Sequence, residues 1–399
     1  MLKTIQQNNN IMLAKVDLSF KQIREFERTK HVHRLHPYLG KFIPQLVEVF
    51  LKKYFTQDDV ILDPFSGSGT TLVEANIRGM DSIGIELSKF NCMITKIKTQ
   101  DYDLELLKKE ILDILKKTQE FSNGIKNNKS LSDIITNKTK YFVNSEYLNT
   151  WFAKNSLKEL LFYLNQIQDY TYQDILKIIL TRSARSARLV PHFELTRAEK
   201  PVYGPYYCHK HNRTCFPIDN AIKFINRYSL DTIKRVKEFS KLKTSKKAYI
   251  LHGDSKTINI KKALIEQLKE KIDKEITGIF TSPPYVGLID YHDQHRYAYE
   301  LLGMPLNGHI EIGTKSNGSG KSAQKIYQED IIKALVNLRK QISDNAKIFF
   351  VVNDKNNLYQ EIAERSGFTI IERFERPVLM KASRERTPYS ESILHMIKN

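Results

Sequence analysis

The chain has 399 residues, 41% of them hydrophobic, and three cysteines. This size and apolar content allow one large domain with an insertion, or two domains, and argue against a small disulfide-held scaffold. The 63 Lys and Arg against 45 Asp and Glu give a net charge of +18, which favours a polyanionic partner such as DNA, RNA or an anionic membrane surface. No run approaches the ~18 apolar residues of a membrane span, and the few cysteines indicate a reducing, cytoplasmic setting.

Five short apolar runs predict parallel strands, because each ends in a polar or glycine-rich turn and helix-like periodicity follows. They cover residues 60–63, 82–86, 247–251, 277–281 and 346–353. Helices are expected at 71–76 and 358–365, and two terminal strands at 368–374 and 392–397. The sequence therefore predicts an α/β fold with a doubly wound, mostly parallel seven-stranded sheet.

The interval between the second and third predicted strands is several times longer than the roughly 30 residues of a βαβ unit. It contains a charged helical stretch at 104–117, a polar segment at 122–140 and an apolar, aromatic stretch at 141–180. We expect residues 1–98 and 247–399 to form the two parts of one catalytic domain. Residues 99–246 are expected to form a largely helical insertion, and the glycine-containing stretch 308–325 a mobile loop.

A glycine-containing segment, Asp63-Pro-Phe-Ser-Gly-Ser-Gly-Thr-Thr71, follows the first predicted strand and opens a helix. Gly67 and Gly69 allow the backbone to approach a ligand, and Asp63 presents a carboxylate at the carboxyl end of the sheet. Glu86, at the end of the next strand, is placed to accept hydrogen bonds from the ribose hydroxyls of a nucleoside. The third glycine of a dinucleotide fingerprint is absent, so a smaller adenosyl ligand is favoured over NAD. The alternative is a tight structural turn.

A second segment, Thr281-Ser-Pro-Pro-Tyr285, ends the fourth predicted strand. Its two prolines fix a rigid turn and leave nearby carbonyl oxygens free to accept from an amine. Tyr285 offers an aromatic face for stacking on a base, and Ser282 an oxygen for an exocyclic amino group. The alternative is an ordinary proline turn that ends a strand.

Together the two segments resemble those of the amino-methyltransferases of DNA, in which Asp-Pro-Phe-x-Gly-x-Gly-Thr binds S-adenosylmethionine and Ser-Pro-Pro-Tyr is typical of the cytosine-N4 group. The resemblance extends to residues 36–46 and 252–255. It implies the fold of S-adenosylmethionine-dependent methyltransferases and a set of donor-binding residues: Lys41, Phe42, Asp63, Phe65, Gly67, Gly69, Thr70, Glu86 and Asp254. The catalytic residues that it implies are Ser282, Pro283, Pro284 and Tyr285.

The resemblance implies methyl transfer from S-adenosylmethionine to N4 of cytosine in double-stranded DNA, with the base flipped out of the helix. Family members that act on adenine N6 usually have an acidic or amide residue in place of Ser282, so adenine is the runner-up target. A basic nucleic-acid-binding protein with a vestigial donor site is the alternative from another class, and methylation of a protein or RNA amine is a third. A cognate restriction endonuclease that acts on the same site is a further implication of the family.

Basic residues suited to contact DNA occur in three places. Arg182, Arg185 and Arg188 recur every three residues, so a helix would present them along one side. Lys321 belongs to the expected mobile loop, and Arg384 and Arg386 to the closing hairpin. Arginines near aromatic side chains suit phosphate and base contacts, and a solvated charged face is the alternative.

Two further patterns were weighed as ligand sites. Residues 318–322, Gly-Ser-Gly-Lys-Ser, resemble a P-loop, but Lys315 stands where that motif needs glycine, which argues against ATP binding. The run Cys208-His-Lys-His-Asn-Arg-Thr-Cys215 has the residue types of a zinc knuckle without the paired Cys-x-x-Cys spacing. The sequence therefore favours two buried or incidental cysteines and no metal. His31, His33 and His36 are assigned no role.

Overall fold

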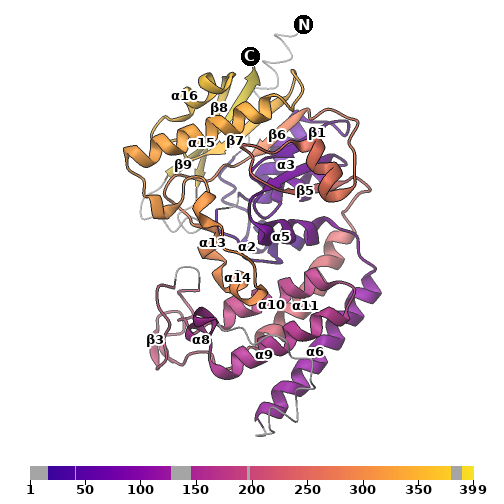
Figure 1. Ribbon diagram of the computed structural model, residues 1–399, viewed down its shortest axis with the longest axis vertical. Helices are drawn as coiled ribbons and strands as arrows, with labels where there is room; N and C mark the ends of the chain where they lie inside the picture. Colours follow the sequence, from indigo (N-terminus) through magenta and orange to yellow (C-terminus); the bar gives the residue numbers. More distant parts are fainter. Residues whose placement is uncertain (1–16, 41, 127–144, 196–197, 379–388) are drawn as a thin grey trace.

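A computed structural model describes residues 17–40, 42–126, 145–195, 198–378 and 389–399. Seven strands form one sheet in the order β5-β2-β1-β6-β7-β9-β8 (Figure 1). The strands are β1 (Val60–Asp63), β2 (Asp81–Glu86), β5 (Ala248–His252), β6 (Gly278–Thr281), β7 (Lys347–Val352), β8 (Phe368–Val378) and β9 (Tyr389–Lys398). The first five are parallel, and β9 runs antiparallel to β7 and β8. The predicted fold class is confirmed.

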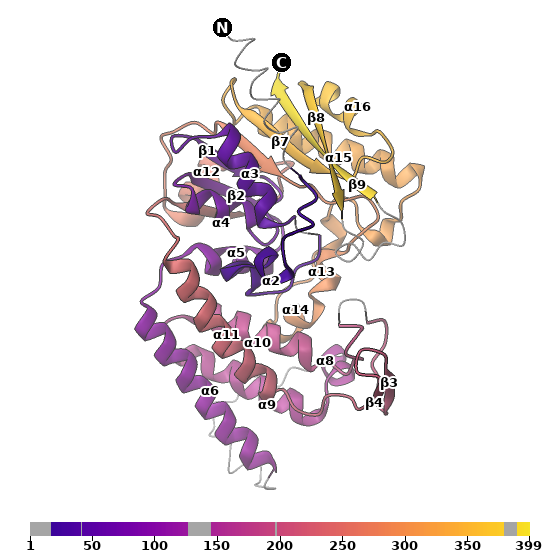
Figure 2. The ribbon, with the colours of Figure 1, turned by 180° about the vertical axis from the view of Figure 1, so that it is seen from behind.

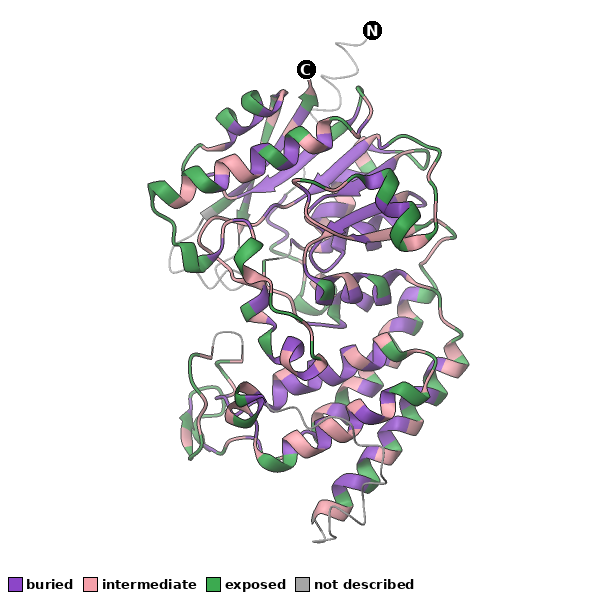
Figure 3. Cartoon of the chain, viewed as in Figure 1, coloured by how far each residue is buried: buried purple, intermediate pink, exposed green. Residues whose placement is uncertain are grey.

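Successive side chains of the central strands enter two different cores, as the alternation of a pleated strand requires. In β7, Ile348 and Phe350 belong to one core and Phe349 to the other. Because both faces are covered, the strands are continuous apolar runs, which is the pattern of a parallel sheet. Figure 3 shows these strands as buried along most of their length.

Helices cover the sheet on both faces. α3 (Pro44–Tyr54) and α4 (Thr70–Ile77) pack on one face, as seen from behind in Figure 2, and α15 (Lys321–Arg339) and α16 (Tyr359–Ser366) on the other. α5 (Lys89–Thr99) lies beside α4. The remaining short helical segments are α2 (Glu25–Arg28), η1 (His31–Arg34), α12 (Ile260–Ala263), η3 (Leu264–Leu268), α13 (Tyr291–Gln294), η4 (Gly308–Ile310) and η5 (Lys315–Asn317). Among the described residues no helix is both long and apolar enough to cross a membrane.

The long interval between β2 and β5 forms a helical lobe at one end of the molecule (Figures 1 and 2). Its helices are α6 (Leu104–Lys126), α8 (Glu146–Trp151), α9 (Lys154–Gln166), α10 (Gln173–Ala187) and α11 (Ile222–Ser240), with a small hairpin of β3 (Tyr206–Cys208) and β4 (Arg213–Cys215). One hydrophobic core runs from the lobe into α5 and α14 (Arg296–Leu302), through residues such as Phe90 and Tyr297. The predicted division at residues 99 and 246 stays a prediction, since the lobe shares its core with both parts of the sheet domain.

The loop between β1 and α4 depends on backbone conformations that favour glycine. Gly67 has a φ of +50° and Gly69 a φ of +75°. A Cβ atom on Gly69 would lie 2.5 Å from Cγ2 of Thr95, which α5 places against the loop. The loop therefore approaches α5 too closely for a side chain at this position.

We expect Gly69→Ala to lower the free energy of unfolding by about 2–5 kcal/mol, the sum of a left-handed backbone and an overpacked contact. Gly303→Ala is the matched control: Gly303 has a φ of +63°, and no described heavy atom lies within 4 Å of its added Cβ. The control should lose only about 1–2 kcal/mol. Urea unfolding of both variants measures the difference, and equal losses would contradict a steric role for Thr95.

Candidate active site

The two sequence motifs meet at the centre of the sheet. β1 and β6 are adjacent and parallel, and they end at Asp63 and Thr281. The Thr281 hydroxyl donates to Asp63 Oδ1 over 2.6 Å, although 218 positions separate the two buried residues. The strand connections diverge here, and ligands of open α/β sheets bind outside the carboxyl ends of the strands at such a switch point.

The glycine-containing loop is held in shape by its own backbone and by α5. The Gly69 N–H donates to the Ser66 carbonyl over 2.7 Å. The buried Lys98 ammonium donates to the Ser68 carbonyl over 2.5 Å. These two hydrogen bonds therefore stabilise the loop conformation.

Glu86 joins this loop to the end of β2. Its carboxylate accepts hydrogen bonds from the N–H groups of Gly67 and Ser88, each over 2.8 Å, and from the Asn91 amide over 3.4 Å. Burial raises the pKa of Glu86 to about 7, while these three hydrogen bonds oppose the shift. In its ionised form the Glu86 carboxylate can accept further hydrogen bonds.

Asp63 is the second buried carboxylate of the site. Burial raises its pKa to about 6, against hydrogen bonds from Thr281, Thr71 and the Phe65 N–H that favour ionisation. Two carboxylates with raised pKa values at one edge of a sheet are typical of a functional site.

A pocket at this edge brings most of the predicted residues together. The predicted residues that line it are Phe42, Asp63, Phe65, Gly67, Thr70, Glu86, Asp254, Ser282 and Pro284. Gly69 lies in the chain between two lining residues, Ser68 and Thr70. Pro283 and Tyr285 are likewise neighbours of lining residues in the chain. Lys41 lies outside the described residues.

Three further residues line the pocket without a role assigned from the sequence: Tyr38, from the segment 36–46, and Tyr291 and Glu311, which belong to no motif. The Tyr38 and Tyr291 rings stack with centroids 5.7 Å apart, and the Tyr38 hydroxyl would lie 2.8 Å from a Cβ atom on Gly67. Close packing of Tyr38 is a second reason for glycine at position 67. Both tyrosines are placed by contacts distant in sequence, so only the aromatic content of residues 36–46 hinted at one of them.

Glu311 comes from the stretch that the sequence predicts to be a mobile loop. Its carboxylate accepts from the backbone N–H groups of Tyr291 and His292, each over 2.9 Å, and also contacts the His292 ring. These bonds hold Ile310 and Ile312 in the pocket wall. In this structure the stretch packs over the pocket; its mobility stays a prediction.

The segment after β6 is supported from the far end of the chain. The Tyr285 hydroxyl donates to Glu391 Oε1 over 3.0 Å, and Arg376 pairs with Glu391 Oε2 at 2.5 Å. Ser282 Oγ lies 3.4 Å from the Tyr285 hydroxyl. The terminal strands β8 and β9 thus orient the tyrosine, a role for Glu391 and Arg376 that no local pattern revealed.

Comparison with known proteins identifies the family of the chain. Residues 17–97 match a family model described as DNA methylase. The chain is 42% identical to the type II methyltransferase M.MjaII of Methanocaldococcus jannaschii, over 95% of this chain and 83% of that protein. The chain belongs to the DNA amino-methyltransferase family.

Two further proteins that are similar to this amino-methyltransferase have lower sequence identity. The type II methyltransferase M.MvaI of Kocuria varians is 22% identical over 76% of this chain and 65% of its own length. The solved rRNA methyltransferase aviRa of Streptomyces viridochromogenes is 10% identical, with a TM-score of 0.33 over 91% of this chain and 88% of that one. That structural likeness is too low to carry an argument.

The amino-methyltransferase uses S-adenosylmethionine as methyl donor, and the pocket fits such a ligand. The hydroxyls of Ser66 and Ser68 are buried in its wall without a hydrogen-bond partner among the described residues. Asp63 and Glu86 add carboxylate acceptors, and apolar side chains such as Phe65 surround them. The pocket therefore offers polar partners for a ribose and an amino acid part, together with apolar walls for a purine.

The prediction that Arg182, Arg185 and Arg188 line an exposed side of a helix is wrong for two of the three. Arg182 is only 5% exposed, pairs with Asp231 at 2.7 Å and lies 4.1 Å over the Tyr228 ring. α10 packs between α11 and α14, so positions three residues apart face neighbouring helices instead of solvent.

Arg188 is 8% exposed and donates to the Leu195 carbonyl over 2.7 Å. Its guanidinium also lies 5.0 Å from the centre of the Tyr297 ring, in α14. Arg185 is half-buried. Arg182 and Arg188 therefore hold the lobe together, and only Arg185 stays a candidate for DNA contact.

The other residues predicted to contact DNA are Lys321, Arg384 and Arg386. Lys321 is exposed at the first position of α15, directly after the loop that packs over the pocket. Arg384 and Arg386 lie outside the described residues. In the described part of the chain no strand leads into residues 318–322, in agreement with the argument against a P-loop.

We expect the affinity for S-adenosylhomocysteine to fall by up to about tenfold between pH 8 and pH 6, because a Glu86 carboxyl with a pKa of about 7 must lose its proton to accept ribose hydroxyls. Protonation on the acid side removes one acceptor oxygen, so the sign is weaker binding at lower pH. Calorimetry at both pH values measures the change.

Glu86→Gln is the matched control for this pH dependence. Its amide does not titrate, while the amino group of the ligand and Asp63 titrate as in the unchanged protein. The difference between the two pH profiles therefore isolates Glu86. Parallel profiles would contradict a titrating Glu86 in the donor site.

Proposed function

We propose that this amino-methyltransferase transfers a methyl group from S-adenosylmethionine to N4 of cytosine at a specific sequence in double-stranded DNA. The observation that carries the proposal is the position of Ser282, which lines the same pocket as Asp63 and Glu86 at the end of the adjacent strand. A serine here offers a neutral hydroxyl to an exocyclic amine, whereas adenine-specific relatives usually have an acidic or amide residue. Adenine N6 is the second candidate, because the same geometry holds either amine.

Within the donor site, we assign Glu86 to the ribose hydroxyls and Asp254 to the adenine. Phe42 and the loop from Asp63 to Thr70 then face the methionine part. S-adenosylmethionine supplies a methyl group that its sulfonium makes electrophilic. Because the donor is already activated, the protein has to position the acceptor, and no cysteine nucleophile or covalent intermediate is needed.

The acceptor amine is a poor nucleophile, since its lone pair is delocalised into the ring, and it is inaccessible inside a duplex. Flipping the base out costs a few kcal/mol of stacking and pairing. The Ser282 hydroxyl and the Pro283 carbonyl are proposed to accept the amine hydrogens, so that the nitrogen lone pair points toward the donor. The Tyr285 ring, with its hydroxyl held by Glu391, is proposed to stack on the flipped base.

For the duplex itself, we propose contacts from Lys321 and Arg185, with the helical lobe as the region that reads the sequence. The net charge of +18 supports a polyanionic partner. M.MjaII and M.MvaI are named as type II methyltransferases. A restriction endonuclease with the same recognition site is therefore a proposed partner.

The deciding experiment expresses the protein in a host without DNA methylation and analyses plasmid nucleosides by mass spectrometry. We expect N4-methylcytosine at one sequence motif. Detection of N6-methyladenine instead would identify adenine as the target base. Unmodified plasmid, from protein shown to bind the donor, would overturn the proposed function.

Ser282→Ala should reduce kcat by about 10–100-fold, because one hydrogen bond to the reacting amine is worth roughly 1.4–2.8 kcal/mol in the transition state. Donor affinity should stay within about twofold, since the hydroxyl is assigned to the base and not to the donor. Single-turnover methylation of a duplex oligonucleotide measures the rate. Ser240→Ala, at the exposed end of α11, is the control, and an unchanged rate for Ser282→Ala would contradict the assigned role.

Lys321→Gln should weaken DNA binding and reduce the slope of log K against log salt by about 1, since one phosphate contact is lost. Donor affinity should not change. Lys262→Gln removes another exposed lysine, on α12 and outside the pocket lining, and should leave the slope unaltered. Fluorescence anisotropy at several salt concentrations gives both slopes; identical slopes would remove Lys321 from the DNA interface.

A further inference from the structure

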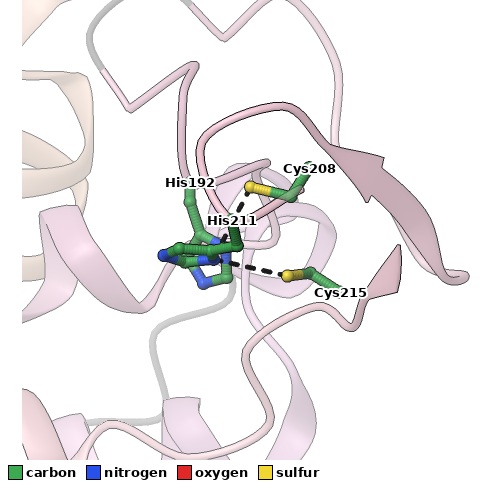
Figure 4. Close-up of side chains that lie close together, drawn as sticks. All are labelled: His192, Cys208, His211 and Cys215. Carbon is green, nitrogen blue, oxygen red and sulfur yellow. Dashed lines mark hydrogen bonds between the residues drawn. The ribbon is translucent and has the colours of Figure 1, made fainter. Parts of the chain in front are cut away.

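Four side chains with metal-ligand atoms converge at the edge of the helical lobe, far from the donor pocket. They belong to His192, Cys208, His211 and Cys215, and one ligand atom of each lies within 4.8 Å of the others. Figure 4 shows the His211 ring between the two sulfur atoms, with His192 beside it. His192, sixteen positions before Cys208, is the member that the sequence pattern missed.

The separations match a tetrahedral zinc site. Zn–S bonds of about 2.3 Å and Zn–N bonds of about 2.0–2.1 Å at tetrahedral angles place sulfur and nitrogen about 3.5–3.6 Å apart. His211 Nδ1 lies 3.6 Å from Cys208 Sγ and 3.5 Å from Cys215 Sγ. Two sulfur and two imidazole ligands are a donor set that zinc prefers.

The conformation of the hairpin brings Cys208, His211 and Cys215 together. Cys208 ends β3 and Cys215 ends β4, and the register pairs Tyr206 with Cys215. The His211 N–H donates to the Cys208 carbonyl over 3.1 Å, and Asn212 takes a left-handed φ of +50°. The turn thus folds His211 back toward both sulfurs. Cys-x-x-His supplies here the short spacing that Cys-x-x-Cys supplies in other zinc sites.

His192 has the outer contact that ligating histidines usually have. The Tyr206 hydroxyl lies 2.9 Å from His192 Nδ1 and also accepts from the His192 backbone N–H over 3.2 Å. When Nδ1–H donates to this hydroxyl, the lone pair is on Nε2. Such a partner fixes the tautomer and the ring orientation of a ligating histidine.

The hairpin buries few of its own side chains. Between Tyr203 and Pro217 the buried residues are Cys208 and Cys215, whereas Tyr207 and Phe216 are 52% and 69% exposed. An isolated two-stranded hairpin is marginally stable in water, and small elements without a core often depend on a metal.

A second compact group of possible metal ligands consists of His31, His33 and Glu74, but its carboxylate already has partners. The Glu74 carboxylate already accepts from His33 and pairs with Lys30, within the buried interior. In the hairpin cluster, by contrast, His211 Nδ1 contacts the two sulfur atoms.

We propose that His192, Cys208, His211 and Cys215 bind one structural zinc ion that holds the β3–β4 hairpin on the lobe. The proposal differs from the expectation of two buried or incidental cysteines without a metal, and it adds His192 to the three residues of the knuckle pattern. The proposal is independent of the target base, because the cluster shares no residue with the donor pocket.

The test measures zinc in the full-length protein, purified without chelator, by plasma mass spectrometry. We expect about one zinc per chain, and a drop below about a tenth in Cys208→Ser/Cys215→Ser. Cys92→Ser and His209→Ala, which remove another cysteine and a neighbouring histidine, should retain the metal. Cobalt(II) exchanged into the unaltered protein should give thiolate charge-transfer bands and the intense visible bands of a tetrahedral site.

The cobalt spectrum uses the unaltered chain, so misfolding of the double variant does not obscure the result. Three outcomes would overturn the proposal. The first is that the unaltered protein holds no zinc and takes up none when zinc is added. A Cys208–Cys215 disulfide in protein purified under reducing conditions would show that the sulfurs are not ligands, as would zinc retained by the double variant.

Discussion

The active site depends on the hydrogen bond between Asp63 and Thr281, which fixes the end of β1 against the end of β6. The glycine-containing loop follows Asp63, and the Ser-Pro-Pro-Tyr segment follows Thr281. The two segments are distant in the sequence, and this contact places them side by side. Insertion of a whole helical lobe between β2 and β5 leaves the contact intact, because both strands of the switch point lie inside the sheet. The insertion of the lobe therefore does not interrupt the contact between the ends of β1 and β6.

The buried carboxyls of Asp63 and Glu86 have a cost in folding stability. Their raised pKa values mean that folding favours the protonated carboxyls, so their contribution to stability is present at low pH and is lost as the pH rises through about 6 and 7. At neutral pH the ligand-free protein retains buried charges that only hydrogen bonds stabilise. A ligand with hydroxyl and amino groups would offset that cost, which links donor binding to the stability of the sheet edge.

The sequence was sufficient for the strands and for the residues of the two motifs, because both are local: apolar runs mark buried strands, and glycine or proline marks the turns after them. It was not sufficient for Tyr38, Glu311 and Glu391, whose roles come from contacts between segments far apart in the chain. Arg182 and Arg188 were misjudged for the same reason. A spacing of three residues places side chains on one side of a helix, but it does not reveal whether that side faces water or another helix. His192 joined the hairpin cluster in the same way, through tertiary packing.

The buried Arg188 contributes a contact between the helical lobe and α14. Arg188 packs on Tyr297, and Tyr297 belongs to α14, which follows the Ser-Pro-Pro-Tyr segment by only a short stretch of chain. α14 also shares the core of the lobe, so the segment between Tyr285 and Tyr297 is anchored to the catalytic turn at one end and to the lobe at the other. Any shift of the lobe, such as one caused by contact with DNA, would act on this segment directly. The contact of Arg188 with Tyr297 therefore joins the helical lobe to the chain that leads from Tyr285.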